Sequence, residues 1–107
     1  MARNKFQTLT EQMFYILLAL QSPCCGVDCM ERVRQMTQGR ITLGPGTLYT
    51  LLASFEEAGL IAQTALEGRR RIYAMTPAGR EMLQGEYARL KAMTADYAAY
   101  YREEEKQ

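Results

Sequence analysis

The sequence has no histidine and no tryptophan among its 107 residues. Without histidine, the Ser-His-Asp and Cys-His catalytic arrangements, histidine-ligated metals and histidine-based pH sensing are excluded. The chain also lacks any run of about 18 apolar residues, so no transmembrane helix is expected. Its start carries two basic residues, but no small-residue cleavage site follows, so we expect no signal peptide.

Neither sign of charge dominates, because 13 Lys and Arg stand against 12 Asp and Glu, a net charge of +1. This balance does not indicate a nucleic-acid binder unless the positive charge is concentrated locally. Apolar residues make up 48% and charged residues 23%, which is typical of a soluble globular protein. The length supports one domain with at most one protruding element. Such a domain buries only about two-thirds of its unfolded surface, which leaves room for a partner chain to complete its core.

Cysteine is scarce and clustered, with Cys24, Cys25 and Cys29 inside six positions. An odd count at this spacing is no disulfide framework and favours a reduced, cytoplasmic protein. Three interpretations stay open. The thiols are small buried apolar groups, or a redox switch in which Cys25 and Cys29 share one side of a helix, or a thiolate metal site. The CxxC spacing of a metal site is missing, so we expect no metal and no cofactor.

Hydrophobic spacing predicts three short helices in the first 59 residues. The first follows a capping-box spacing at Thr8 and ends at Ser22-Pro23. The second starts near Gly26 and ends at Gly39. The third starts at Pro45 and ends at Gly59. Their apolar stripes are Leu9, Met13, Ile16, Leu17 and Leu20; Val27, Met30 and Val33; and Leu48, Leu51, Leu52, Phe55 and Ala58.

The spacing of apolar residues then changes from the helical period to the alternation of β-strands. It predicts a β-hairpin with strands at residues 60–66 and 69–75 on either side of Glu67-Gly68. Thr76-Pro77 predicts the start of a last helix of about 28 residues. A heptad-like seam runs along that helix, and the preceding residues are too few to cover it, so we expect it to pack on a second copy of the chain. The expected interface residues are Leu83, Tyr87, Leu90, Met93, Thr94, Tyr97 and Tyr101.

Three helices followed by a hairpin is the order of a winged helix-turn-helix, whose third helix enters the DNA major groove and whose hairpin is called the wing. We therefore expect a mostly α fold with a small β-hairpin. Residues 1–76 would form the DNA-binding domain and residues 77–107 the dimerisation helix. The outer face of the third helix carries small or hydrogen-bonding residues, namely Thr47, Tyr49, Thr50, Ala53 and Ser54.

The hairpin carries the strongest electrostatic signal. Arg69, Arg70 and Arg71 follow Gly68 at the tip, and three consecutive arginines on a hairpin cannot all face a core. Arginine binds phosphate bidentately and suits a narrow minor groove. The Gly44-Pro45-Gly46 entry to the third helix also leaves backbone N–H groups open to a phosphate.

Four segments together resemble the PadR family of bacterial winged-helix repressors. They are LTEQMFYILLAL, CGVDCMERV, GPGTLYTLLASFEEAGLI and EGRRRIYAMTPAGREML. The resemblance covers residues 8–83 well, and the single long last helix is similar to that of the small subfamily.

The resemblance implies a homodimer that binds a pseudo-palindromic operator on double-stranded DNA, represses a nearby gene and is released by a small apolar or aromatic effector. The expected DNA-contacting residues are Arg40, Gly46, Thr47, Tyr49, Thr50, Gly68, Arg69, Arg70 and Arg71. Tyr87, Met93 and Tyr97 are candidates for lining an effector pocket between protomers. The family usually has His-Gly-Tyr where this chain has Cys25-Gly26-Val27, and the tryptophan that some small relatives stack on flat drugs is missing.

Two other classes of protein remain as alternatives. A winged-helix adaptor for protein partners would show a neutral wing and an acidic third-helix face, and this sequence shows neither. An enzyme is disfavoured because the acidic clusters at residues 56–57 and 103–105 accompany no Gly-rich loop and no metal-ligand set. A MarR-like repressor would change only the dimer geometry.

Overall fold

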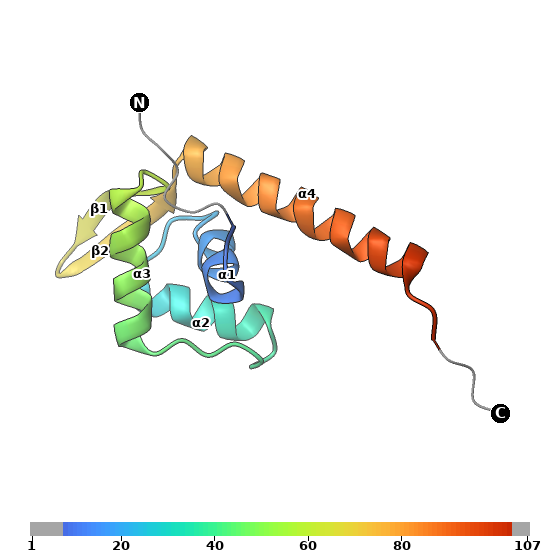
Figure 1. The fold of residues 1–107 in the computed structure, drawn as a ribbon. Helices are drawn as coiled ribbons and strands as arrows, with labels where there is room; N and C mark the ends of the chain where they lie inside the picture. Colours follow the sequence, from blue (N-terminus) through green and yellow to red (C-terminus); the bar gives the residue numbers. More distant parts are fainter. Residues whose placement is uncertain (1–7, 104–107) are drawn as a thin grey trace.

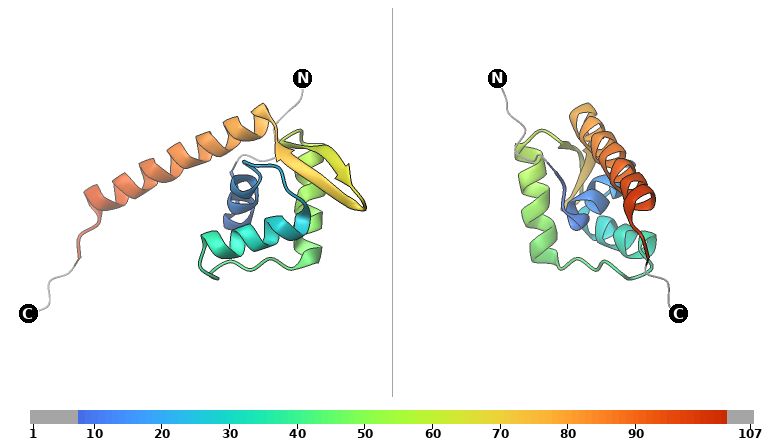
Figure 2. Two further views of the ribbon diagram at one scale, coloured as in Figure 1. Left: turned by 180° about the vertical axis from the view of Figure 1, so that it is seen from behind. Right: turned by 45° about the vertical axis from the view of Figure 1, so that its right-hand side comes forward.

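The computed structural model describes residues 8–103, which form a small helical bundle with a β-hairpin on one side and a long helical arm on the other (Figure 1). The elements in chain order are α1 (Glu11–Ala19), α2 (Gly26–Met36), α3 (Pro45–Glu57), β1 (Ile61–Glu67), β2 (Arg70–Met75) and α4 (Pro77–Tyr100). The hairpin and the free end of α4 leave the bundle in opposite directions, as Figure 2 shows from behind. This order confirms the mostly α fold with a small hairpin.

The core lies where α1, α2, α3 and the base of the hairpin meet. It is closed by fully buried apolar side chains, among them Ile16, Leu17, Val33, Leu48, Leu52, Phe55 and Ile61. The stripe predicted for α3 supplies three of these residues, so the outer face of that helix remains free. No helix in residues 8–103 is long and apolar enough to cross a membrane.

The start of α1 differs from the prediction. Its N-cap is Thr10, whose hydroxyl accepts a hydrogen bond from the Met13 amide at 3.2 Å, and no capping box forms at Thr8. The reason lies one residue earlier, where the Leu9 amide donates to the Glu86 carboxylate at 2.9 Å. Leu9, the residue before this N-cap, is therefore tied to α4.

The stripe predicted for α2 is also partly wrong. Val27 is 54% exposed, whereas Gly26, Cys29 and Val33 are buried. Because the small residues Gly26 and Cys29 let α2 approach its neighbours closely, the helix turns this face inward and Val27 outward. The start at Gly26 is as predicted, but α2 ends at Met36, three residues before the predicted stop. Gln38, with a φ of 53°, and Gly39, with a φ of 82°, then take the left-handed conformation that leads the chain away from the helix.

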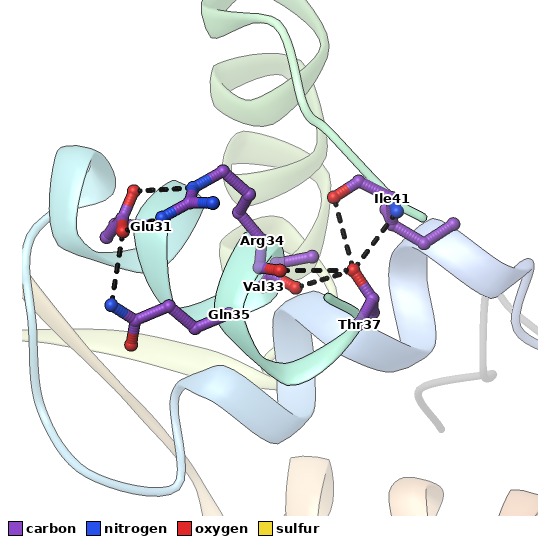
Figure 3. Close-up of polar contacts among 6 residues, drawn as sticks. All are labelled: Glu31, Val33, Arg34, Gln35, Thr37 and Ile41. Carbon is purple, nitrogen blue, oxygen red and sulfur yellow. Dashed lines mark hydrogen bonds and ion pairs between the residues drawn. The ribbon is translucent and has the colours of Figure 1, made fainter. Parts of the chain in front are cut away.

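The turn from α2 towards α3 is held by one buried hydroxyl (Figure 3). Thr37, which is 1% exposed, donates to the Val33 carbonyl at 2.9 Å and accepts from the Ile41 amide at 3.0 Å. Beside it, Glu31 forms an exposed ion pair with Arg34 at 2.6 Å. The hydroxyl fixes the path of the loop that delivers α3, and nothing in the hydrophobic pattern marked Thr37 for that role.

The hairpin is antiparallel as predicted, with Ile61 opposite Met75 and Glu67 opposite Arg70. Gly68 takes a φ of 63° at the tip, a conformation that glycine adopts readily. Cys24 adds a bridge to β2, because its amide and carbonyl pair with those of Tyr73 at 3.1 and 2.9 Å. This bridge anchors the hairpin to the segment between α1 and α2.

The last helix starts at Thr76-Pro77 as predicted but is shorter than expected. It has 24 residues and ends at Tyr100, while Tyr101 is extended. The Arg102 guanidinium donates to the Ala99 carbonyl at 3.0 Å and so caps the end. The acidic residues that follow are unfavourable near the negative end of a helix dipole, which accounts for the early stop.

Two contacts hold the base of α4 against the bundle. Gly79 lies so close to the Leu60 carbonyl that a Cβ at this position would overlap the carbonyl oxygen. Glu86, which is 4% exposed, forms an ion pair with Arg89 at 2.9 Å and accepts the Leu9 amide. The Arg89 guanidinium and that amide lower the pKa of Glu86. Sequence reasoning missed Glu86, because a buried glutamate has no signature in an apolar pattern.

Candidate nucleic-acid interface

The outer face of α3 is open along its first two turns. Pro45, Gly46, Thr47, Thr50 and Ala53 are exposed, and Ser54 is partly so. A Cβ added at Gly46 would meet nothing within 4 Å, and the N-cap Gly44 offers no side-chain cap. The amides at this end are therefore accessible, in the arrangement that favours a phosphate at a helix N-terminus.

Tyr49 belongs both to this surface and to the packing beneath it. Its side chain is 48% exposed, and its ring lies over Gly26, where a Cβ would stand 2.7 Å from the tyrosine hydroxyl. The side chain is thus exposed, as the outer-face position predicted, but only partly, because the rest of the ring packs on α2. Its contact with DNA stays a prediction. Any larger residue at position 26 would displace the ring from this position.

The three wing arginines are all exposed, and within residues 8–103 none of them forms an ion pair. The two ion pairs in that range, Glu31 with Arg34 and Glu86 with Arg89, lie on other elements. Glu67 is opposite Arg70 in the ladder but lies outside ion-pair distance. Three unneutralised guanidinium groups therefore gather at the hairpin tip of a chain whose net charge is only +1.

A cleft of about 310 Å³ joins these features. It lies between the start of α2, Tyr49 of α3 and the wing, and its lining consists of Cys25, Gly26, Val27, Tyr49, Arg69, Arg70, Arg71 and Tyr73. Five of the predicted functional residues are thus brought to one place: Tyr49, the three arginines and Cys25. Tyr73 is 6% exposed and contributes to the core.

Arg40 lies apart from this surface. It follows the far end of α2 and donates to the Tyr15 hydroxyl of α1 at 3.4 Å, whereas the cleft is at the start of α2. The 11 residues of α2 span about 16 Å. Arg40 therefore does not share a site with the wing, and its contact to DNA stays a prediction.

The cysteines divide into a pair and a single residue. All three are reduced and buried. The Cys29 thiol, hydrogen-bonded to Cys24, holds the pKa of Cys24 below its usual range, and the same bond together with burial raises the pKa of Cys29. Cys25, which the helical spacing paired with Cys29, instead lines the cleft. Cys25 is the N-cap of α2, and its carbonyl accepts the Cys29 amide at 2.9 Å, so the two residues lie one turn apart and their redox pairing stays a prediction. Within residues 8–103 no group of three potential ligands is placed to hold a metal ion.

The predicted seam on α4 is uncovered beyond its first turns. Leu83 packs on the core, but Tyr87, Leu90, Met93, Tyr97 and Tyr101 are 39–62% exposed. Tyr97 and Tyr101 stack with ring centroids 4.9 Å apart. The Thr94 hydroxyl donates to the Leu90 carbonyl within the helix. A helical stripe of this length and composition is unusual on a protein surface unless a partner covers it.

Comparison with known proteins agrees with this geometry. Residues 16–85 match the model of the transcriptional regulator PadR-like family. An uncharacterized 37.1 kDa protein of a Streptomyces fradiae transposon is 35% identical over 80 residues, which are 75% of this chain but only 23% of that relative's length.

Solved structures share the fold at low sequence identity. A PadR-like transcription factor from Bacteroides fragilis superposes with a TM-score of 0.72 at 22% identity, covering 84% of this chain and 89% of that one. A transcriptional regulator from Clostridium thermocellum gives 0.69 at 19% identity, covering 86% and 93%.

The family model spans well over half of the chain, and the winged-helix arrangement agrees with it. Members of the family are DNA-binding transcriptional regulators, which confirms the expectation that the chain is not an enzyme. The chain belongs to the PadR-like family of transcriptional regulators.

Proposed function

We propose that the protein is a cytoplasmic repressor that binds a pseudo-palindromic operator as a homodimer. The observation that carries this proposal is the convergence of the open α3 face and three unpaired wing arginines on one side of the bundle. The α3 face would lie in the major groove and the wing on the flanking backbone. In this proposal residues 1–76 bind DNA and residues 77–107 join the protomers.

The dimer would form through α4. The exposed seam lies on α4, whose free end leads away from the hairpin in Figure 1, so a second copy could cover it without touching the DNA-facing surface. Burying large apolar side chains stabilises association by about 25 cal/mol per Å². We also propose that Tyr87, Met93 and Tyr97 line a pocket between the two helices. A small apolar or aromatic effector bound there would release the DNA, since methionine and tyrosine adapt to flat ligands.

An adaptor for protein partners is the weaker candidate. The exposed residues of α3 between Pro45 and Ser54 include no acid, and the wing carries three cations. A surface of this kind complements the phosphates of DNA. It does not complement a basic or an apolar peptide.

The direct test of DNA base recognition is the substitution Thr50→Ala on α3. We expect binding to the DNA upstream of the protein's own gene to weaken by about 1 kcal/mol, or about fivefold, because the alanine cannot hydrogen-bond in the major groove. Binding to random DNA of equal length should change by less than twofold. Fluorescence anisotropy at fixed salt measures both, with Thr8→Ala, an exposed threonine before α1, as the matched control. Equal losses on the two DNAs would contradict a base-reading role.

The dimer is tested by Tyr97→Glu, which places a charge in the seam. We expect this variant to sediment as a monomer at micromolar concentration, because burying an unpaired carboxylate costs several kcal/mol. Ala92→Glu, which lies on the opposite side of α4 and is exposed, should remain dimeric. Helical content by circular dichroism should match in the two variants. A dimeric Tyr97→Glu protein would rule out this seam as the interface.

A further inference from the structure

Cys25 is the cysteine that lines the cleft between α2, Tyr49 and the wing. It is only 4% exposed, yet it forms part of the cleft wall together with Val27, Tyr49 and the wing. Cys24 and Cys29, by contrast, belong to the core cluster and interact with each other. Cys25 is therefore the one cysteine of the three that lines this cleft.

The cavity favours a particular class of reagent. Three guanidinium groups and no carboxylate stand among its eight lining residues. The N-cap Cys25 makes no side-chain hydrogen bond to the first amides of α2, and Gly26 and Val27 of that first turn line the cleft. Both features attract anions. At about 310 Å³ the cleft is at the small end of ligand pockets, so only a small molecule fits.

We propose that Cys25 is a thiol-modification site that reacts with a small anionic disulfide in this cleft, and that the resulting adduct blocks DNA binding. The Cys25 sulfur, after losing its proton to solvent, attacks one sulfur of the disulfide. A new S–S bond forms, the S–S bond of the reagent breaks, and its second half leaves as a thiolate with the bonding electron pair. The disulfide is the oxidant, and excess thiol reverses the step.

The expected consequence for DNA binding follows from position. The adduct would occupy the space between Tyr49 and the wing and would place a negative group beside Arg69–Arg71. The negative group of the adduct would then already neutralise these arginines when DNA approaches. This second half of the inference rests on the proposed function, whereas the reaction at Cys25 does not.

The reaction is tested with 5,5′-dithiobis(2-nitrobenzoate), a doubly anionic disulfide whose released thiolate absorbs visible light. We expect one fast-reacting thiol per native chain and the other two only after unfolding. The fast phase should vanish in Cys25→Ala and in Cys25→Ser, and persist in Cys24→Ala and in Cys29→Ala. A fast phase that disappears with Cys24 or Cys29 instead, or no fast phase at all, would overturn the site.

Charge selection has its own comparison. Replacing Arg69, Arg70 and Arg71 by glutamine, or raising the salt concentration, should slow the anionic reagent at least fivefold. The same changes should leave the rate with neutral 4,4′-dithiodipyridine within twofold. An equal change for both reagents would overturn the electrostatic part of the proposal.

The DNA consequence is read by anisotropy before and after modification, with each variant compared with itself. The modified wild-type protein should bind DNA at least tenfold more weakly and recover with dithiothreitol, while treated Cys25→Ser should not change. Unaltered binding by the fully modified protein would refute the blocking role. If unmodified protein binds no DNA, the proposed function fails, and the reaction kinetics still decide the modification site.

Discussion

Replacing Arg69, Arg70 and Arg71 together by alanine is expected to abolish tight DNA binding while leaving the fold intact. The three side chains are exposed and form no ion pair in residues 8–103, so their removal costs little folding free energy. On DNA, each cation that neutralises a phosphate releases counterions, and the slope of log K against log salt falls by about 0.9 for each cation removed from a phosphate.

For a dimer with two wings this predicts a slope smaller by up to about 5 and an affinity lower by at least about 100-fold at moderate salt. Anisotropy titrations at four salt concentrations measure both quantities. The matched control is the triple variant Arg34→Ala, Arg80→Ala, Arg102→Ala, which removes the same charge from exposed positions outside the wing. Equal losses in the two triple variants would show that net charge, and not the wing, carries the interaction.

The second large effect concerns stability. Gly79→Ala should lower the free energy of unfolding by about 3 kcal/mol, because the new methyl group overlaps the Leu60 carbonyl oxygen and also approaches Met75. The overlapping atom belongs to the backbone, and the Leu60 carbonyl already accepts the Thr76 amide at 3.0 Å, so it cannot move aside cheaply. The melting temperature should fall by more than about 10 °C.

Gly85→Ala, six residues along the same helix, is the matched control. It is exposed and meets nothing within 4 Å, so it should stabilise the protein by about 1 kcal/mol. Urea unfolding followed by circular dichroism compares the two variants at one protein concentration. A Gly79→Ala protein as stable as the wild type would show that α4 does not seat on the strand as described.

The helices and the hairpin could be predicted from the sequence because proline, glycine and capping residues mark their boundaries. Pro45, Gly59 and Thr76-Pro77 fixed the bounds of α3 and the start of α4, and the arginines after Gly68 fixed the wing tip. The exposed face of α3 followed from its apolar stripe, because a buried side of a helix defines the other side.

What sequence could not supply was contact between distant segments. Glu86 and Leu9 are 77 positions apart, and their hydrogen bond accompanies a start of α1 later than the capping-box spacing predicted. The packing of Tyr49 on Gly26, and the position of Cys25 in the wall of the cleft, depend on how α2 and α3 cross. Periodicity within one helix carries no information on that crossing.

The seating of α4 has a mechanical consequence. Leu60 and Leu9 contact its first three turns and Gly59 accepts from its N-cap Thr76, so the base of the helix is attached to the DNA-binding fold at three points. Its 24 residues form a lever about 36 Å long. In the proposed dimer, a change of about 5° in the angle between two such levers would displace the two reading helices relative to each other by about 3 Å. Half-sites on DNA are spaced by a helical turn of about 34–36 Å, so a displacement of this size is enough to lose register at one of them.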